Sequence, residues 1–432
     1  MASSLRTKLR IAGSVVFATG FWDALAGRFL FQPNVSARGG VEADEPPDGW
    51  RDLAGAVHVH STYSDGAGDV PVVMEAARRA GVDWILLTDH NSQQSRRDGW
   101  EEKYAVTPLL LIGTEVTVEH GAFLLALDLP SNWETAPRQK PQTVVDDVIA
   151  HGGLPLVSLP FDVKHPWRDW NVTGCAGLEV INLSTVARRH INLFSAAWLV
   201  PLYRYKGALA ALRALVTRPD QPLATWDRLT AGGKPFAGLC ALDAHALMKI
   251  GRHKYPLPSY ADSFQAAATH VLAPPTFEVA DAVERRKAIY DALRHGRCYL
   301  SYDCLGDPTG FKFTASGDDQ SRVARMGERI GDAGAGVLLR AAAPPAARTR
   351  TLVRLLRDGT IVAAGEGGVA CRATLPGAYR VEVFRFDWRV GGVYVVARPW
   401  IFSNPIYVGH GREDAGTLPN DSASLHGAGH GL

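Results

Sequence analysis

Short apolar runs alternate with longer mixed segments over the N-terminal part of the chain, between residues 54 and 242. Seven runs have the length of buried strands: Ala54–Val59, Trp84–Leu87, Leu109–Ile112, Ala122–Leu127, Leu154–Leu159, Leu178–Leu183 and Phe236–Leu242. The segments between them are long enough for helices or loops. Strands that alternate with helices usually form a largely parallel sheet, so the pattern predicts an α/β fold.

One helix is well marked between residues 69 and 81. Asp69 can cap its N-terminus, Pro71 suits its first turn, and Gly81 can end it. Met74 and Ala77 lie at helical spacing between these signals. We therefore expect a helix that packs one face against the sheet.

A second helical region extends from Leu193 to Val216 and is strongly apolar. Arg204, Lys206 and Arg213 interrupt it, so it lacks the run of about 20 apolar residues that a membrane span needs. The pattern favours a buried helix pair.

The pattern changes after about residue 305 to short β-like runs separated by turn residues. Examples are Thr351–Leu356, Thr360–Ala364, Tyr379–Phe384 and Gly392–Val396. Residues 305–410 are therefore predicted to form a small all-β, sandwich-like domain. The tail, residues 411–432, has too few apolar residues to fold, and we expect its histidines to be disordered rather than metal-binding.

The first 30 residues are typical of a signal peptide or N-terminal anchor. Basic residues precede the apolar run Ile11–Phe21, and Ala24 and Ala26 form a small-x-small cleavage pattern before Gly27. Export to the periplasm or outside the cell is the preferred interpretation. The alternative is a docking helix on a cytoplasmic protein. Residues 31–52 then read as a polar linker.

Composition excludes some classes of protein. The chain has 432 residues, of which 46% are hydrophobic, so it can bury a large core and is not disordered. Its 46 Lys and Arg nearly balance its 44 Asp and Glu, without a long basic block, so nucleic acid is not the expected partner. The five cysteines have no metal-binding spacing and are best read as isolated thiols, although a Cys298–Cys304 disulfide is conceivable.

Metal-binding side chains follow four of the apolar runs. His58 and His60 lie two residues apart, so on an extended strand both face the same side. His90, Glu115 and the Asp243-Ala244-His245 segment follow three other runs. The C-terminal ends of parallel barrel strands meet on one face, which would bring these side chains together. Imidazole and carboxylate ligands suit Zn, Mn or Fe(II).

The motifs resemble, in order and spacing, those of the PHP (polymerase and histidinol phosphatase) family. They read His58-x-His60-Ser61, Ser64-Asp65-Gly66, Thr88-Asp89-His90-Asn91, Gly113-x-Glu115 and Asp243-x-His245. This resemblance implies a distorted seven-stranded (β/α) barrel over residues 53–304. It also implies two or three divalent metal ions that hydrolyse phosphate esters. The segment after residue 296 resembles exported members of the family with an appended β-domain.

The resemblance also implies which residues hold the ions. One ion would be bound by His58, His60, Glu115 and Asp243, with Glu115 bridging to a second ion. Another would be bound by Asp65, His90 and His245. His120 lies near the position of a further ligand of the second ion, although the local spacing matches only approximately.

Leu159 is the clearest departure from the family pattern. The family places a histidine ligand in an Ala/Ser-His-Pro triplet, and here the triplet is Ser158-Leu159-Pro160. His165 could fold back to replace the missing ligand or protonate a leaving group, or it could be an ordinary loop histidine. Lys164 and Arg168 could bind phosphate oxygens, or they could belong to a solvated basic loop.

Three functions follow from these observations. The first is a metal-dependent phosphoesterase that hydrolyses a small phosphorylated molecule through metal-activated hydroxide. The second is a degenerate PHP protein that acts as a non-catalytic binding or scaffold protein, which Leu159 favours. The third, a nucleic-acid-processing enzyme, is disfavoured by the nearly neutral charge and the export-like start. The oligomeric state is left open.

Overall fold

The computed structural model describes residues 30–31, 49–191, 193–250, 253–255, 257–317, 323–331, 336–386, 388–390 and 393–409. Most of the predicted signal segment and linker, and the whole predicted tail, lie outside the described residues. Among the residues described, no helix combines the length and apolar character needed to cross a membrane.

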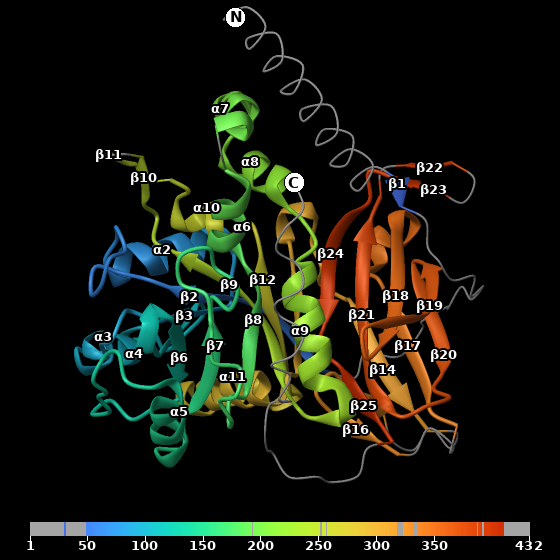
Figure 1. Ribbon diagram of the computed structural model, residues 1–432, viewed down its shortest axis with the longest axis horizontal. Helices are drawn as coiled ribbons and strands as arrows, with labels where there is room; N and C mark the ends of the chain where they lie inside the picture. Colours follow the sequence, from blue (N-terminus) through green and yellow to red (C-terminus); the bar gives the residue numbers. More distant parts are fainter. Residues whose placement is uncertain are drawn as a thin grey trace, which may run out of the picture.

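All seven predicted strands are present, and they belong to a mixed α/β fold with a large sheet that is rich in parallel pairs (Figure 1). The parallel strands, in spatial order, are β4 (Leu109–Ile112), β3 (Trp84–Leu87), β2 (Arg51–Val59), β9 (Ala237–Ala244), β8 (Gly177–Asn182) and β7 (Leu154–Ser158). Most of their residues are buried, which explains why they read as continuous apolar runs.

Two strands depart from this parallel arrangement. β6 (Phe123–Leu127) pairs antiparallel with both β7 and β5 (Thr114–Thr117). Gly113 alone separates β5 from β4, and a Cβ there would lie 2.4 Å from Leu127 Cδ2. Because residue 113 is a glycine, β4 and β5 can follow each other directly while β4 pairs with β3 and β5 pairs with β6.

The predicted helix is confirmed as α2 (Val70–Ala80). Asp69 accepts a hydrogen bond from the Val72 amide, and Gly81 ends the helix with φ 76°. The other helices near the sheet are α3 (Gln94–Arg97), α4 (Trp100–Lys103), α5 (Pro141–Ala150), α9 (Asp220–Thr230), α10 (Tyr260–Phe264) and α11 (Ala282–His295).

The apolar region after residue 193 forms the predicted helix pair, α7 (Leu193–Lys206) and α8 (Ala208–Leu215), which follows α6 (Leu183–His190). The prediction that the pair is buried is wrong for α7, in which Phe194 and Tyr205 are 76% and 81% exposed. Leu199 packs against Val186 of α6 and Leu215 of α8. The rest of α7 projects from the molecule, because too few neighbours are present to cover a helix that is apolar on every side (Figure 1).

The C-terminal strands are antiparallel and extend the large sheet. β12 (Ala268–Ala273) pairs with β2, and β13 (Cys298–Ser301) joins β12 to β24 (Arg398–Ser403). Beyond β24 lie β21 (Gly377–Arg385), β18 (Thr351–Arg357), β19 (Thr360–Glu366), β25 (Ile406–Val408) and β16 (Arg329–Ile330). The sheet therefore continues across the boundary predicted at residue 304.

A second, antiparallel sheet packs on this C-terminal part and shares its core. Its strands are β15 (Val323–Arg325), β14 (Lys312–Ser316), β17 (Leu338–Ala342) and β20 (Gly368–Arg372). Smaller pairings involve β1 (Leu30–Phe31), β22 (Trp388–Val390) and β23 (Val393–Val395), and the hairpin β10 (Met248–Ile250) with β11 (His253–Tyr255). All five cysteines are free thiols, so Cys298 and Cys304 do not form a disulfide.

Candidate metal centre

His58 and His60 converge at the C-terminal end of β2. Their Nε2 atoms lie 3.0 Å apart, and both side chains are fully buried. The convergence does not come from a regular strand, because His58 has φ 65° and the pairing register of β2 shifts between Val57 and Val59. Positive φ is costly for a non-glycine residue and is often retained where it aims a functional side chain.

The first group of metal-binding side chains surrounds these two nitrogens. Glu115 Oε1 lies 3.2 Å from His58 Nε2, and Glu115 Oε2 lies 3.5 Å from His60 Nε2. Asp243 Oδ1 lies 3.6 Å from His58 Nε2 and 3.5 Å from His60 Nε2. The ligand atoms of His58, His60 and Glu115 are close enough to share one ion.

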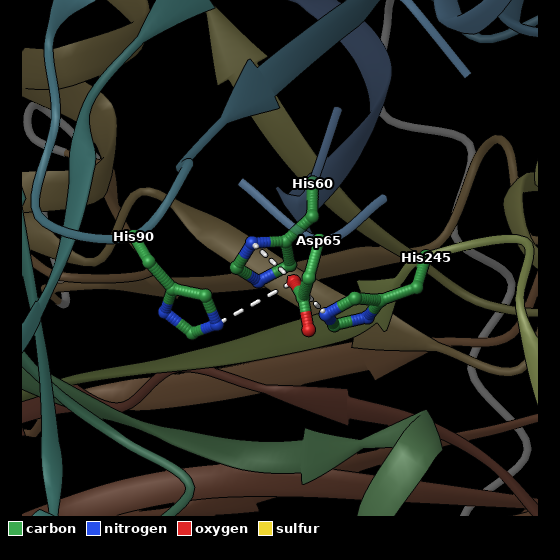
Figure 2. A group of neighbouring side chains, drawn as sticks. All are labelled: His60, Asp65, His90 and His245. Atoms are coloured by element: carbon green, nitrogen blue, oxygen red, sulfur yellow. Dashed lines mark ion pairs between the residues drawn. The ribbon is translucent and has the colours of Figure 1, made fainter. Parts of the chain in front are cut away.

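The second group centres on Asp65, whose carboxylate faces three imidazoles (Figure 2). Asp65 Oδ1 lies 2.9 Å from His245 Nε2, 3.5 Å from His90 Nε2 and 4.0 Å from His60 Nδ1. These residues come from three chain segments, the loop after β2, the loop after β3 and the loop after β9, and the structure brings them within reach of one ion.

Glu115 connects the two groups. Its Oε2 lies 3.0 Å from His90 Nδ1, a buried nitrogen that makes no hydrogen bond within the described part of the chain. A cation bound by these two atoms would satisfy both. Neutral imidazoles and carboxylates are the ligand types that Zn, Mn and Fe(II) accept, and the site therefore fits a divalent metal.

The charges in the centre favour ionised carboxylates. Burial alone would raise the pKa of Glu115, but His58, His90 and His60 beside it hold the pKa well below its usual value. A hydrogen bond with His245 lowers the pKa of Asp65 to about 2. Burial alone would lower the pKa of His58, yet Glu115 and Glu179 raise it well above its usual value. A bound cation would take the place of the imidazole protons in balancing these carboxylates.

Glu179, which the sequence analysis did not select, supports the first group from β8. Its Oε1 lies 2.6 Å from His58 Nδ1, and its Oε2 accepts hydrogen bonds from the Leu159 amide at 2.8 Å and Asn182 Nδ2 at 2.9 Å. An acid inside an apolar strand is costly to bury unless it has partners, and this feature could have identified it.

Other side chains fix the loop between His60 and Asp65. Asp89 accepts hydrogen bonds from the amide and hydroxyl of Ser61 and from the hydroxyl of Ser64. The Tyr260 hydroxyl donates to the His60 carbonyl at 2.7 Å. The loop is therefore positioned by contacts with two distant segments.

Arg188 of α6 is a second residue that the sequence analysis missed. Its guanidinium donates to Asp243 Oδ2 and lies 3.2 Å from Asp162 Oδ2. The side chain is partly exposed, so it presents a positive charge at the edge of the metal centre.

Four predicted residues lie outside both groups. His120 is exposed and its nearest ion-pair contact is Glu119, at 4.0 Å. His165 Nδ1 donates to the Gly121 carbonyl at 3.1 Å. Lys164 and Arg168 are exposed in the same loop as His165. Their assignments stay predictions.

A cavity of about 490 Å³ borders Glu179, although none of the seven clustered side chains lines it. Glu179 and Leu159 form part of its wall, with Asn182 and Val186 beside them and Arg189 further along. Leu159 is buried, so its side chain gives this wall an apolar surface. The volume is that of a site for a small organic molecule.

No family model matches the chain, and a comparison with curated proteins finds no match. Among solved structures, it is similar to a two-domain protein from Bacteroides vulgatus containing a predicted PHP-like metal-dependent phosphoesterase, with 15% identity, TM-score 0.37, and coverage of 84% of this chain and 100% of that one. PsfC from Pseudomonas syringae is 13% identical, with a TM-score of 0.35. The match covers 54% of this chain and 87% of PsfC. The chain is also similar to an amidohydrolase from Chromobacterium violaceum, with bound sulfate and no metal. The identity is 12%, the TM-score is 0.27, and the match covers 48% of this chain and 92% of the amidohydrolase.

The overlaps are too low to identify a reaction.

Proposed function

We propose that this protein is a metal-dependent hydrolase that cleaves a phosphate ester of a small molecule. The proposal rests on the two side-chain groups joined by Glu115, whose Oε1 lies 3.2 Å from His58 Nε2 and whose Oε2 lies 3.0 Å from His90 Nδ1. Two neighbouring groups that share a carboxylate are suited to hold more than one ion.

The proposed ligands divide as the two groups do. His58, His60, Glu115 and Asp243 would hold one ion, and Asp65, His90 and His245 another. When bound, divalent ions polarise a phosphate ester and lower the pKa of water. Arg188 would bind non-bridging phosphate oxygens, since its guanidinium already contacts a carboxylate of the centre.

The cavity beside Glu179 would receive the organic part of the ester. Its wall combines apolar residues such as Leu159 and Val186 with the guanidinium of Arg189. We place the site on a distorted barrel of the PHP type. The pairs β3–β4 and β5–β6, which the chain connects through Gly113, support this arrangement.

Metal analysis combined with a panel of phosphate esters tests the proposal. We expect at least one transition-metal ion per chain, and hydrolysis of at least one ester. The triple variant His58→Ala/His60→Ala/Asp243→Asn should lose the ion held by the first group and all activity. His151→Ala, at an exposed helix end, serves as the control and should behave as the wild type.

Two results would contradict this proposal. Unchanged metal content in the folded triple variant would refute the ligand assignment. A wild type that binds metal but hydrolyses no ester would favour the alternative of a non-catalytic binding protein, to which the leucine at position 159 points.

A further inference from the structure

α7 is unusual because it is apolar on every side and yet lies on the surface. Its sequence, LFSAAWLVPLYRYK, has polar groups concentrated only at its C-terminal end. Helices of this kind are normally buried in a protein core or in lipid. Here Leu199 anchors the helix against α6 and α8, and most of the remaining surface faces outward.

The exposed aromatic side chains of the described residues are all in this helix. They are Phe194, Trp198, Tyr203 and Tyr205. Val200 and the preceding Ile191 add exposed aliphatic surface. The other exposed large apolar residues are scattered singly over the molecule, which is ordinary. Phe194, Trp198 and Tyr205 are spaced four and seven residues apart, so on the helix they share one face, and an exposed aromatic face of this kind marks a surface that binds something.

The charges around the patch have one sign. No Asp or Glu occurs between Ile191 and Pro219, whereas Arg204 and Lys206 are exposed at the end of α7. Aromatic residues flanked by Lys and Arg, without acids, are typical of helices that lie in the interface of anionic membranes.

We propose that α7 docks this protein on an anionic phospholipid surface. With 14 residues, the helix is about 21 Å long, which is shorter than the roughly 30 Å hydrocarbon core of a bilayer. It therefore lies in the plane of the interface. The aromatic side chains enter the headgroup layer, and Arg204 and Lys206 contact lipid phosphates.

Docking through α7 also orients the metal centre. α6 immediately precedes α7, and its Arg188 contacts Asp243 of the centre. The part of α6 that contacts the centre is thus held close to the docked helix. Lipid binding itself depends on α7 and not on the proposed hydrolase activity.

Vesicle co-sedimentation of the full chain tests this proposal. We expect the wild type to bind vesicles of equal parts phosphatidylglycerol and phosphatidylcholine, and to bind pure phosphatidylcholine more weakly. Phe194→Ser/Tyr205→Ser should reduce the partition coefficient about tenfold or more, since two large apolar side chains no longer enter the interface. Arg204→Gln/Lys206→Gln should remove the preference for the anionic lipid.

Val279→Ser/Val283→Ser provides a matched control, because it removes two equally exposed apolar side chains from another surface. This control should bind as the wild type does. The proposal is overturned if the wild type ignores anionic vesicles, or if the Phe194/Tyr205 variant binds them equally well. It is also overturned if light scattering shows a wild-type dimer that becomes a monomer in that variant, without any lipid binding.

Discussion

Glu179 is the residue that fixes the orientation of His58 in the candidate metal centre. Both of its carboxyl oxygens are engaged, one by His58 Nδ1 and the other by the Leu159 amide and Asn182. A carboxylate that accepts the Nδ1 proton of a histidine leaves Nε2 as the free ligand and fixes the ring orientation. His58 Nε2 is the atom that faces Glu115 and Asp243.

We therefore expect Glu179→Gln to weaken metal binding by about 10–100-fold while the protein stays folded. The amide is nearly the same size as the carboxyl but carries no charge to hold the Nδ1 proton. Competition with a chelator of known affinity measures the change. Glu134→Gln, at an exposed position, is the control, and equal affinities in the two variants would refute the positioning role.

The conformation of the loop after β7 determines where the His165 side chain lies. Asp162 accepts hydrogen bonds from the amides of Lys164 and His165, at 2.8 and 3.1 Å, which closes the loop on itself. The His165 ring then packs edge-on against Phe123, with 5.1 Å between ring centroids. This loop conformation holds His165 against Phe123 and Gly121, apart from both ligand groups.

From this geometry we predict different effects of two substitutions on metal content. His165→Ala should leave metal content unchanged, because its ring is bound elsewhere. Leu159→His should increase metal content or affinity. Residue 159 has φ 47°, which histidine tolerates better than most residues, and its amide is fixed on Glu179.

Metal analysis of the two purified variants beside the wild type checks this prediction. A loss of about one ion in His165→Ala would show instead that the loop rearranges to supply a ligand.

At the scale of the whole molecule, ionic groups join elements that are far apart in the sequence. His270 of β12 lies between Asp52 of β2 and Asp303, at 2.9 and 3.3 Å, and stacks on Tyr299 of β13. Farther along, Arg380 of β21 binds Asp227 of α9. Such contacts make the C-terminal strands part of one continuous structure.

The His270 cluster predicts a pH dependence of stability. Burial alone would lower the pKa of His270, but Asp303 and Asp52 outweigh it and raise the pKa to about 10, from an ordinary value of 6.5. Because the folded state holds the proton more tightly, this contribution to stability is full below pH 6.5. It is lost as the pH rises from 6.5 to about 10.

Denaturant unfolding of wild type and His270→Gln across this pH range measures the effect. The free energy of unfolding should fall more steeply with pH in the wild type than in the variant. Parallel pH profiles would show that His270 is not protonated in the folded protein.

The sequence by itself determined the features that depend on neighbouring residues. The strands read as apolar runs because they are buried, and the bounds of α2 follow from a cap and a glycine that act within one turn. The histidine and carboxylate motifs at the strand ends were equally visible, and the structure brings seven of those eight side chains together.

Only the tertiary structure decided the features that depend on distant partners. Glu179 lies 121 residues from His58, and Arg188 lies 55 residues from Asp243, so no local pattern could pair them. The bulge at His58 arises where β2 meets its neighbours. The exposure of α7 likewise could not be read from its composition, because an apolar helix is buried only if other elements are present to cover it.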